Sequence, residues 1–296
     1  MPNQGKHMGN QRSILSWSTI KRRKFFSAFI IYAILIAATG FAVIPILWGL
    51  STSFKVPTDI LATPPRWIPS QLTVENYLKG FLTPKFLRYL FNSSLVVVGS
   101  LILSIGLATH AAYAVSRRRF AGKSFLLFLV WATIMIPGVS IIVPLYLLSV
   151  DLGIYDTYTV LILVYSAWLV PTLIWLLRGF IDSIPIELEE SALIDGCTRL
   201  KTFYLVVFPL LLPGLAAAGV LVFVTIWNDF LIGFSLVLSD ERRLLQVGLY
   251  SFVTDLGIEW GPLMGATIGS LIPAALVFAF MQRAFIRGIT GGAVKG

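Results

Sequence analysis

Six long runs of the sequence contain no Asp, Glu, Lys or Arg, and this feature limits the possible folds more than any other. Each run holds about 20 residues or more, enough to cross the ~30 Å hydrocarbon core of a bilayer as a helix. The sequence therefore predicts an all-α polytopic membrane protein with about six transmembrane helices. The runs are 25–50, 89–116, 124–150, 157–177, 202–228 and 260–282.

The composition agrees with burial in lipid. Hydrophobic residues make up 57% of the 296 residues and charged residues only 12%, whereas soluble domains carry about 25% charged residues. The first run is longer than the apolar region of a signal peptide and has no small-residue cleavage pattern after it. We therefore expect this run to be an uncleaved signal-anchor helix.

The basic residues predict the orientation. The chain has a net charge of +9, and the larger share of its Lys and Arg falls in alternate connections, most densely in 117–123. Because short cytoplasmic loops are rich in Lys and Arg, both termini are expected in the cytoplasm. No soluble domain is available to carry a basic face, so lipid rather than nucleic acid is the expected partner of this charge.

The sequence offers no catalytic constellation. The two histidines, His7 and His110, lie far apart, and Cys197 is the single cysteine. The segment around Lys123 resembles the end of a phosphate-binding loop, but Arg117 stands where that motif needs glycine. We expect the chain to be no enzyme and to bind no metal or cofactor. His110, alone within an apolar run, indicates either a transport pathway or a hydrogen bond to a neighbouring helix.

Two further patterns lie within the runs. Gly261, Gly265 and Gly269 recur every four residues, which lets another backbone approach one helix face closely. That backbone could belong to the bundle or to a partner subunit. The prolines favour simple kinks over functional hinges: Pro45, Pro137, Pro144, Pro171, Pro213 and Pro273.

The connection 182–209 carries the most informative pattern. Asp182 and Ser183 suit a helix start, Pro185 suits a first turn, and Gly196 suits a left-handed helix end. Thr198 is then placed to cap the next helix. A helix bearing three glutamates would be repelled by an anionic membrane surface, so presentation to a groove of a cytosolic protein is favoured over rest on the membrane.

This connection resembles the "EAA" loop of importer-type ABC permeases, with modest departures at Ser191, Val206 and Phe208. Other segments are similar to the smaller permease subunit of the maltose-type carbohydrate importers: 92–93, 113–114, 119–123, 227–230 and the tail 291–296. Glu190, Ala192, Gly196 and Pro209 keep the register of the motif. The residues that the resemblance implies for coupling to the ATPase are Glu190, Ser191, Ala192, Asp195, Gly196 and Pro209.

The resemblance implies a type I ABC importer permease fold in the cytoplasmic (inner) membrane of a bacterium. It implies a paralogous permease as heterodimer partner, two ATPase subunits that hold the ATP and Mg²⁺, and an extracytoplasmic substrate-binding protein. The loop would couple ATPase movement to the bundle, and the tail residues Gly291, Gly292 and Lys295 would contact the ATPases. The expected cargo is a sugar, a polyol or a glycerol phosphate.

The expected organisation follows from these readings. The ranges are a cytoplasmic tail 1–24, a first span 25–50, an extracytoplasmic segment 51–86, a permease core 87–286 that includes the coupling loop 182–209, and a cytoplasmic tail 287–296. The outer segments 51–86 and 236–259 are either solvated loops or docking surfaces for an outside partner.

Asp229, the one acid in the apolar part of the fifth span, directly follows the run 202–228 and is a candidate for the substrate pathway. With Trp227 and Asn228 it could line a polar cavity for substrate, or it could form a structural bond near the outer interface. The main alternative to an importer permease is an ion-coupled secondary transporter, which would favour inverted repeats and buried ionisable groups. A membrane-embedded enzyme would need paired acids, histidines or a nucleophile.

Overall fold

The structure, a computed structural model, describes the backbone of residues 11–293 and the side chains of residues 26–282. It is almost entirely helical, with one short antiparallel hairpin at the outer end. The long helices are α1 (Gln11–Ser53), α4 (Pro84–Arg117), α7 (Tyr158–Asp182), α10 (Phe208–Trp227) and α13 (Trp260–Ala293). The shorter helices are α2 (Pro57–Ile60), α3 (Glu75–Lys79), α5 (Lys123–Ile134), α6 (Gly138–Asp151), α8 (Ile186–Ile194), α9 (Arg199–Thr202), α11 (Leu231–Leu236) and α12 (Leu245–Tyr250). A π-helix, η1 (Phe203–Val207), a 3₁₀ turn, η2 (Asp240–Arg242), and the strands β1 (Val253–Thr254) and β2 (Gly257–Ile258) complete the chain.

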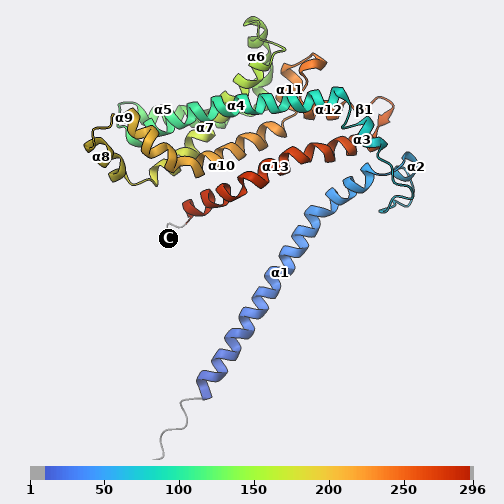
Figure 1. Ribbon diagram of the computed structural model, residues 1–296, viewed down its shortest axis with the longest axis horizontal. Coiled ribbons are helices and arrows are strands. Elements are labelled where there is room, and N and C mark those ends of the chain that lie inside the picture. Colours follow the sequence, from blue (N-terminus) through green and yellow to red (C-terminus); the bar gives the residue numbers. More distant parts are fainter. Residues whose placement is uncertain (1–10, 294–296) are drawn as a thin grey trace, which may run out of the picture.

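The predicted spans are confirmed with one correction. Among the described residues, five helices are long and apolar enough to cross a membrane, and the pair α5 and α6 makes a sixth only if the two count as one span. The pair is bent by 97°, so the run 124–150 is not the straight span that its hydropathy predicts. Pro137 is the cause, because it takes an extended conformation just before α6 and restricts the residue before it. Figure 1 shows α6 pointing away from the bundle.

The other prolines do not break their helices. Pro45, Pro144, Pro171, Pro213 and Pro273 all lie inside continuous helices. Within the described chain, Pro137 alone among the six thus marks a sharp change of direction, which agrees with the prediction that most are simple kinks.

The core of the bundle lies where α4, α7 and α10 pack side by side (Figure 1). Its centre consists of fully buried aliphatic side chains, such as Val96, Leu161, Leu173 and Leu211. Small polar residues of α4 are also fully buried against α7, and they let the two backbones approach closely. This tight three-helix unit fixes the relative positions of the loops at both of its ends.

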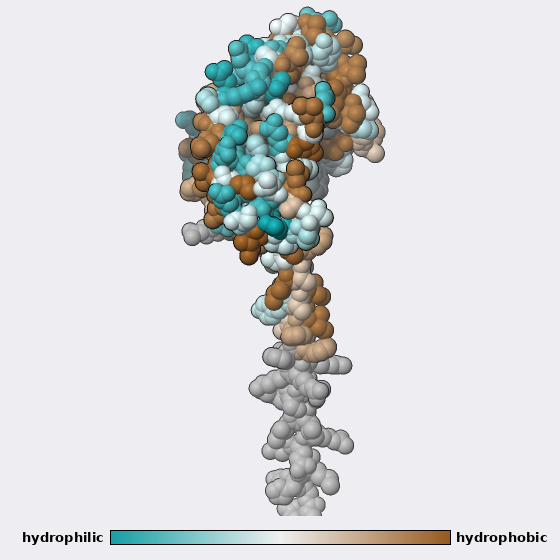
Figure 2. All heavy atoms as spheres, turned by 90° about the vertical axis from the view of Figure 1, so that its right-hand side faces the viewer, coloured by the Kyte–Doolittle hydropathy of each residue, from teal (hydrophilic) through white to brown (hydrophobic). Residues whose placement is uncertain are grey.

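Helix α1 leaves this bundle. None of its most apolar stretch is buried, and the chain contacts it mainly at its outer end, where Gly49 lies against Met264 and Ile268 of α13. Figure 1 shows α1 running away from the other helices towards its N-terminus. Viewed from the outer end, polar residues gather over the bundle, whereas the coloured part of the α1 stalk below is mostly apolar (Figure 2).

The glycine stripe of α13 packs inside the chain. A Cβ added at Gly261 would lie 2.3 Å from the Asn76 side chain, and one at Gly265 would lie 2.8 Å from the Asn76 carbonyl oxygen. Gly269 faces the ring of Phe81 in the same way. Asn76 also donates hydrogen bonds of 3.0 and 2.8 Å to the carbonyls of Ser53 and Lys55. The stripe therefore joins α13 to α3 and to the end of α1, which decides between the two roles left open by the sequence.

Candidate functional site

The predicted coupling connection is a short helix followed by a glycine turn. Helix α8 starts directly after Pro185, whose backbone is extended. It ends at Ile194, and the turn that follows contains Gly196, which has a φ of 87° and donates its N–H to the carbonyl of Leu193 at 3.1 Å. The hydroxyl of Thr198 then accepts a hydrogen bond from the N–H of Lys201 and caps α9. The left-handed turn and the cap are both confirmed.

One local expectation is wrong. Asp182 and Ser183 do not begin α8, because Asp182 is the last residue of α7 and Ser183 caps that helix. Asp182 instead pairs with Arg178, one turn earlier, at 3.3 Å. Continuation of α7 this far leaves only the short linker before Pro185, where proline disfavours helix in the preceding residue.

The motif residues lie mostly on the exposed side of this connection. Apolar side chains of α8 are exposed beside them, and Ile194 is the most exposed at 86%. Acidic and apolar groups thus share one uncovered surface at one end of the bundle. Glu190, Ser191, Asp195, Gly196 and Pro209 are exposed, and Ala192 is half-buried.

Glu189, which the sequence motif does not single out, is the buried member of the three glutamates. Its side chain is 8% exposed and accepts a hydrogen bond from Arg117 at 2.6 Å and another from Tyr113 at 2.8 Å. The sequence provides only an indirect indication of this pair. Arg117 is the last residue of α4, and helical periodicity places one of the three carboxylates of α8 on the inner side of that helix.

The C-terminal tail residues are partly described. Helix α13 continues through Gly291 and Gly292 to Ala293, so both glycines are helical. Lys295 lies outside the described residues.

At the other end of the bundle, Trp227 and Asn228 line an open cavity of about 350 Å³ between α10, α12 and α13. The rings of Trp227 and Phe223 stack at 5.0 Å. Gln246 donates a hydrogen bond to the Trp227 carbonyl at 3.0 Å and adds a second amide to the wall. Most of the wall is aliphatic or aromatic, and Thr267 and Ser270 add two hydroxyl groups to it.

Asp229 does not line this cavity. One of its carboxylate oxygens accepts hydrogen bonds from the Tyr165 hydroxyl at 2.7 Å and from the backbone N–H groups of Ile232 and Gly233 at 3.0 and 3.4 Å. Asp229 therefore caps the start of α11 and links it to α7, as the structural reading of this residue expects.

Asp229→Asn is therefore expected to assemble normally and to transport at nearly the wild-type rate, because the amide oxygen of Asn accepts the same three hydrogen bonds. Asp229→Leu, of similar size, loses all three and is expected to lower both assembly and transport, since the Tyr165 hydroxyl stays buried without its acceptor. Yield of intact complex and uptake into vesicles measure this. Loss of uptake in a fully assembled Asn variant would contradict the capping role.

His110 has the structural role of the two that the sequence allows. Its Nδ1 lies 2.7 Å from the Gly106 carbonyl, and its Nε2 lies 2.9 Å from the Tyr204 hydroxyl in η1. The histidine thus bonds to a neighbouring element, close to the coupling connection.

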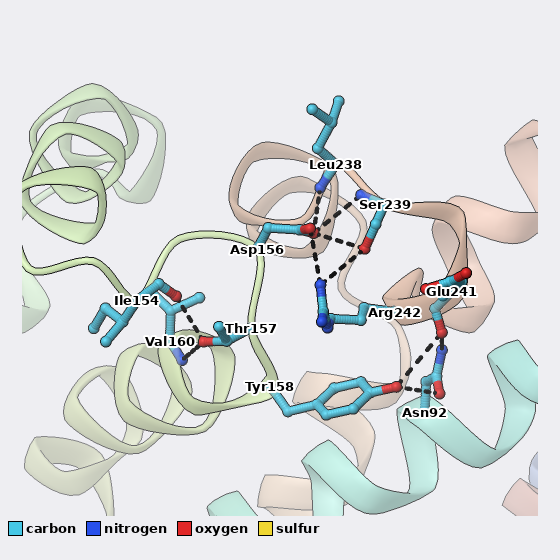
Figure 3. A network of polar contacts seen from close by, with 10 residues as sticks. All are labelled: Asn92, Ile154, Asp156, Thr157, Tyr158, Val160, Leu238, Ser239, Glu241 and Arg242. Carbon is cyan, nitrogen blue, oxygen red and sulfur yellow. Dashed lines mark hydrogen bonds and ion pairs between the residues drawn. The ribbon is translucent and has the colours of Figure 1, made fainter.

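A network of hydrogen bonds, called the clamp below, joins Asp156 before α7 to the loop 238–243 after α11 (Figure 3). Asp156 accepts hydrogen bonds of 3.0 Å from the N–H groups of Leu238 and Ser239, from the Ser239 hydroxyl and from Arg242. Its φ of 58° is left-handed, a conformation in which aspartate is enriched. Burial alone would raise the pKa of Asp156, but these hydrogen bonds and the Arg242 charge outweigh it and hold the pKa below its usual value.

The clamp continues to the outer start of α4. The amide of Asn92 donates to the carbonyl of Glu241 at 2.9 Å and accepts from the Tyr158 hydroxyl at 2.8 Å (Figure 3). It also donates to the carbonyl of Arg243 at 2.9 Å. Asp240 pairs with Lys85 at 2.9 Å. Burial opposes ionisation of Asp240 as well, yet its hydrogen bonds lower its pKa overall. The loop after α11 is therefore rigidly held against α4 and α7.

These lowered pKa values predict how acid affects the clamp. A carboxyl whose folded pKa lies below the unfolded value of about 3.9 stabilises the fold above that pH, and the stabilisation is lost as the pH falls through the folded pKa. We expect the thermal stability in detergent to stay flat from pH 7 to about 5 and to drop below about pH 4. Asp156→Asn keeps the backbone geometry and is expected to reduce this acid-dependent drop. Glu241→Gln, whose exposed side chain takes no part in these contacts, serves as the control, and an unchanged drop in the Asn variant would contradict the assignment.

Beyond the clamp, the hairpin of β1 and β2 projects from the outer end. Val253 pairs with Ile258 and Thr254 with Gly257, and Leu256 at the tip is fully exposed. The tip, which also carries exposed Asp255, is thus free of packing within the described chain and accessible to another molecule.

Comparison with known families identifies the chain. The family described as "Binding-protein-dependent transport system inner membrane component" matches residues 80–291, which include the coupling connection, the clamp and most of α13. The chain belongs to this family. It is thus an inner-membrane permease component, as the resemblance of its loop predicts, and nothing in this finding supports an ion-coupled secondary transporter.

Relatives within the binding-protein-dependent transport family cover nearly the whole chain. The diacetylchitobiose uptake system permease protein DasC of Streptomyces coelicolor is 34% identical over 254 residues, which are 86% of this chain and 92% of DasC. The trehalose/maltose transport system permease protein MalG of Thermococcus litoralis is 32% identical and covers 90% of this chain and 96% of its own. Both matches confirm the predicted maltose-type permease family.

A solved structure agrees with the fold. One chain of a bacterial ABC transporter involved in the import of the acidic polysaccharide alginate superposes with a TM-score of 0.77 at 22% identity, and covers 89% of this chain and 98% of its own. This likeness confirms the all-α ABC importer permease fold.

Proposed function

We propose that the chain is the membrane-spanning permease subunit of an ATP-driven importer for sugars or related polyols and glycerol phosphates. It forms the pathway with a second, paralogous permease and is coupled to two ATPase subunits by the 182–209 connection. The observation that carries this proposal is α8, a short helix that presents acidic and apolar groups without a partner while its inner side is fixed by a buried ion pair.

The relatives support the cargo class. Their names specify diacetylchitobiose, trehalose, trehalose/maltose and sulfoquinovosyl glycerol as transported compounds. These compounds share hydroxyl-rich rings or glycerol groups. The cavity beside Trp227 offers the kinds of group that bind such molecules, an aromatic surface with amides and hydroxyls. We assign Trp227 and Asn228 to the substrate pathway. We assign to Asp229 the structural role of capping α11 and linking it to α7 beside that pathway.

Two uncovered elements support the second permease. Helix α1 has an apolar surface that the rest of the described chain leaves bare, and α6 projects from the bundle at the 97° break. A paralogous permease of the same fold supplies an apolar surface for both. Lipid covers whatever that partner leaves exposed.

The outer end supports contact with a substrate-binding protein. The hairpin, with Leu256 at its tip, lies at the same outer end as the clamp, which would keep the outer loops in a fixed position when a partner binds. Related alginate machinery has been solved in complex with a periplasmic protein bound to alginate pentasaccharide. In this arrangement both termini face the cytoplasm, and ATP with Mg²⁺ is bound by the partner ATPases rather than by this chain, which has no catalytic role.

Purification of the tagged chain in mild detergent tests the proposal, with mass spectrometry of the partners and ATPase activity of the eluate. Wild type should retain a second permease and an ATPase. Glu190→Ala should lose the ATPase or its coupled activity, because Glu190 is exposed on α8. Glu75→Ala is the matched control, since Glu75 is equally exposed but lies on the outer helix α3 in a surface ion pair with Lys79.

An intact wild-type chain that elutes alone and without ATPase activity would sink the proposal. Retention of a fully active ATPase by Glu190→Ala would leave the importer standing but remove Glu190 from the contact.

A further inference from the structure

A single face of α4 holds the whole coupling connection. His110, Tyr113 and Arg117 are spaced by three and four residues, so they lie on one side of the helix near its cytoplasmic end. Together they contact the end of α7 and the chain between α7 and α10, and Arg117 and Tyr113 share Glu189 as a partner. Along this face the contacts run from the linker before α8, through α8, to the π-helix that follows it.

Arg117 forms the first of these contacts and is surrounded by acceptors. Its Nε donates to the Glu189 carboxylate at 2.6 Å, and its Nη2 donates to the carbonyls of Ile181 and Ile184 at 2.9 and 2.8 Å. The pair is largely dry, with side chains 13% and 8% exposed. The planar guanidinium thus fastens the end of α7, the linker and α8 to α4 at the same time.

Tyr113 and His110 extend the attachment beyond α8. The Tyr113 hydroxyl donates to the second oxygen of Glu189 at 2.8 Å, and its ring packs 4.8 Å from the ring of Phe203. His110 lies 2.9 Å from the hydroxyl of Tyr204, the next residue of η1. A π-helix is rare and is found mostly at functional sites, and here it begins where the connection enters the membrane.

Neighbouring glutamates of α8 therefore face different partners. Successive residues of an α-helix point about 100° apart, so Glu189 reaches into the bundle while Glu190 remains exposed. A buried ion pair adds little to stability by itself, but removal of one partner leaves an uncompensated buried charge. Any arrangement of α8 on α4 that separates the two charges while they stay buried is therefore disfavoured.

We infer that Arg117 and Glu189 are positioning residues that make α8 and the cytoplasmic end of α4 move as one body, so that α4 carries the displacement of α8 into the bundle. This inference rests on the proposed function. Without the pair, α8 could follow the ATPase while α4 stayed behind, because α8 itself would then be joined to α4 only through the linker at 183–185 and through the contacts that η1 makes with Tyr113 and His110.

The test measures whether the two elements keep their distance during the ATPase cycle. Nitroxide labels are placed at Phe120→Cys, just beyond α4, and at Leu200→Cys, in α9, within a Cys197→Ser background, since both positions are exposed. Electron–electron double resonance on the complete purified complex compares the nucleotide-free state with the state trapped by ATP and vanadate. A second label pair, Leu200→Cys with Leu256→Cys at the outer tip, reports whether the cycle moves the connection relative to the outer end.

In the wild-type complex we expect the 120–200 distance to be the same in both states while the 200–256 distance shifts. Glu189→Gln and Arg117→Lys are expected to introduce a nucleotide-dependent shift or broadening in the 120–200 distance, with the subunit composition unchanged. Tyr113→Phe removes only the hydroxyl and keeps the ring, so it gives a smaller broadening and remains informative if the charge variants fail to assemble. Glu75→Gln, which breaks an exposed outer ion pair, should behave as wild type.

A 120–200 distance that already shifts in wild type would overturn the inference, and so would an unshifted distance in assembled Glu189→Gln or Tyr113→Phe. Both results leave the importer function intact. A wild-type chain that purifies without any ATPase overturns the proposed function instead, so the two failures are distinguishable.

Discussion

Proline in place of Gly196 is expected to separate the permease from its ATPase. Gly196 has a φ of 87°, whereas proline is locked near −65° and has no N–H to donate to the Leu193 carbonyl. The turn after α8 would have to rearrange, and α9 with it. Since a residue forced out of its allowed region costs about 1–3 kcal/mol, and about 1.4 kcal/mol is tenfold in an equilibrium, we expect the retained ATPase to fall by a factor of roughly 5 to 100.

Two matched variants separate backbone strain from side-chain bulk. Asparagine tolerates the left-handed region, and no atom lies within 4 Å of a Cβ at Gly196, so Gly196→Asn should retain most ATPase. Gly179→Ala, in α7, has equally open surroundings and an ordinary backbone, and should be neutral. Retention of ATPase by Gly196→Pro would show that the turn does not determine the docking of α8.

Alanine at Gly265 is expected to damage the outer half of the bundle rather than the coupling end. Its Cβ would lie 2.8 Å from the Asn76 carbonyl oxygen and 2.9 Å from the carbonyl carbon, and backbone cannot move aside as a flexible side chain can. Overpacking of this kind typically costs about 1–3 kcal/mol. The loss should appear as a lower unfolding temperature of the purified chain and as weaker attachment of α1, because Asn76 also binds the carbonyls at its end.

Gly106→Ala in α4 is the control for this variant, since no atom lies within 4 Å of the added methyl group and alanine favours helix. Its unfolding temperature should equal or slightly exceed that of wild type. An equal unfolding temperature for Gly265→Ala would mean that α3 and α13 do not pack as closely as the structure shows.

The features predicted correctly from sequence are those set by local chemistry or by lipid. The left-handed turn at Gly196 and the cap at Thr198 depend on a few neighbouring residues, and the spans depend on apolar length alone. Hydropathy indicates how long an apolar segment is, however, but not whether it is straight. The run 124–150 therefore predicts enough length for a span but not the 97° bend at Pro137. Asp182 was misplaced because a helix end and the next helix start favour similar residues.

The features that sequence could not decide depend on contacts far along the chain. Glu189 and Glu190 are chemically identical, and only the position of Arg117 makes one of them buried. Asp229 caps α11 through neighbouring N–H groups, but its link to α7 depends on Tyr165, more than sixty residues earlier in the sequence. The glycine stripe found its partner in Asn76, nearly two hundred residues earlier in the sequence, which periodicity within α13 could not reveal.

The position of α1 sets an order of events during synthesis. Helix α1 meets the bundle where Gly49 lies against Met264 and Ile268 of α13. This contact can form only after α13, the last helix of the bundle, has been synthesised. At ~5–20 residues per second, translation of the intervening segment takes roughly 10–40 s. Until α13 is made, α1 contacts only the outer segment that follows it, through residues such as Trp67 and Asn76. Most of its apolar surface then stays open to insertion factors, to quality-control proteases and to any neighbouring permease that is being made at the same time.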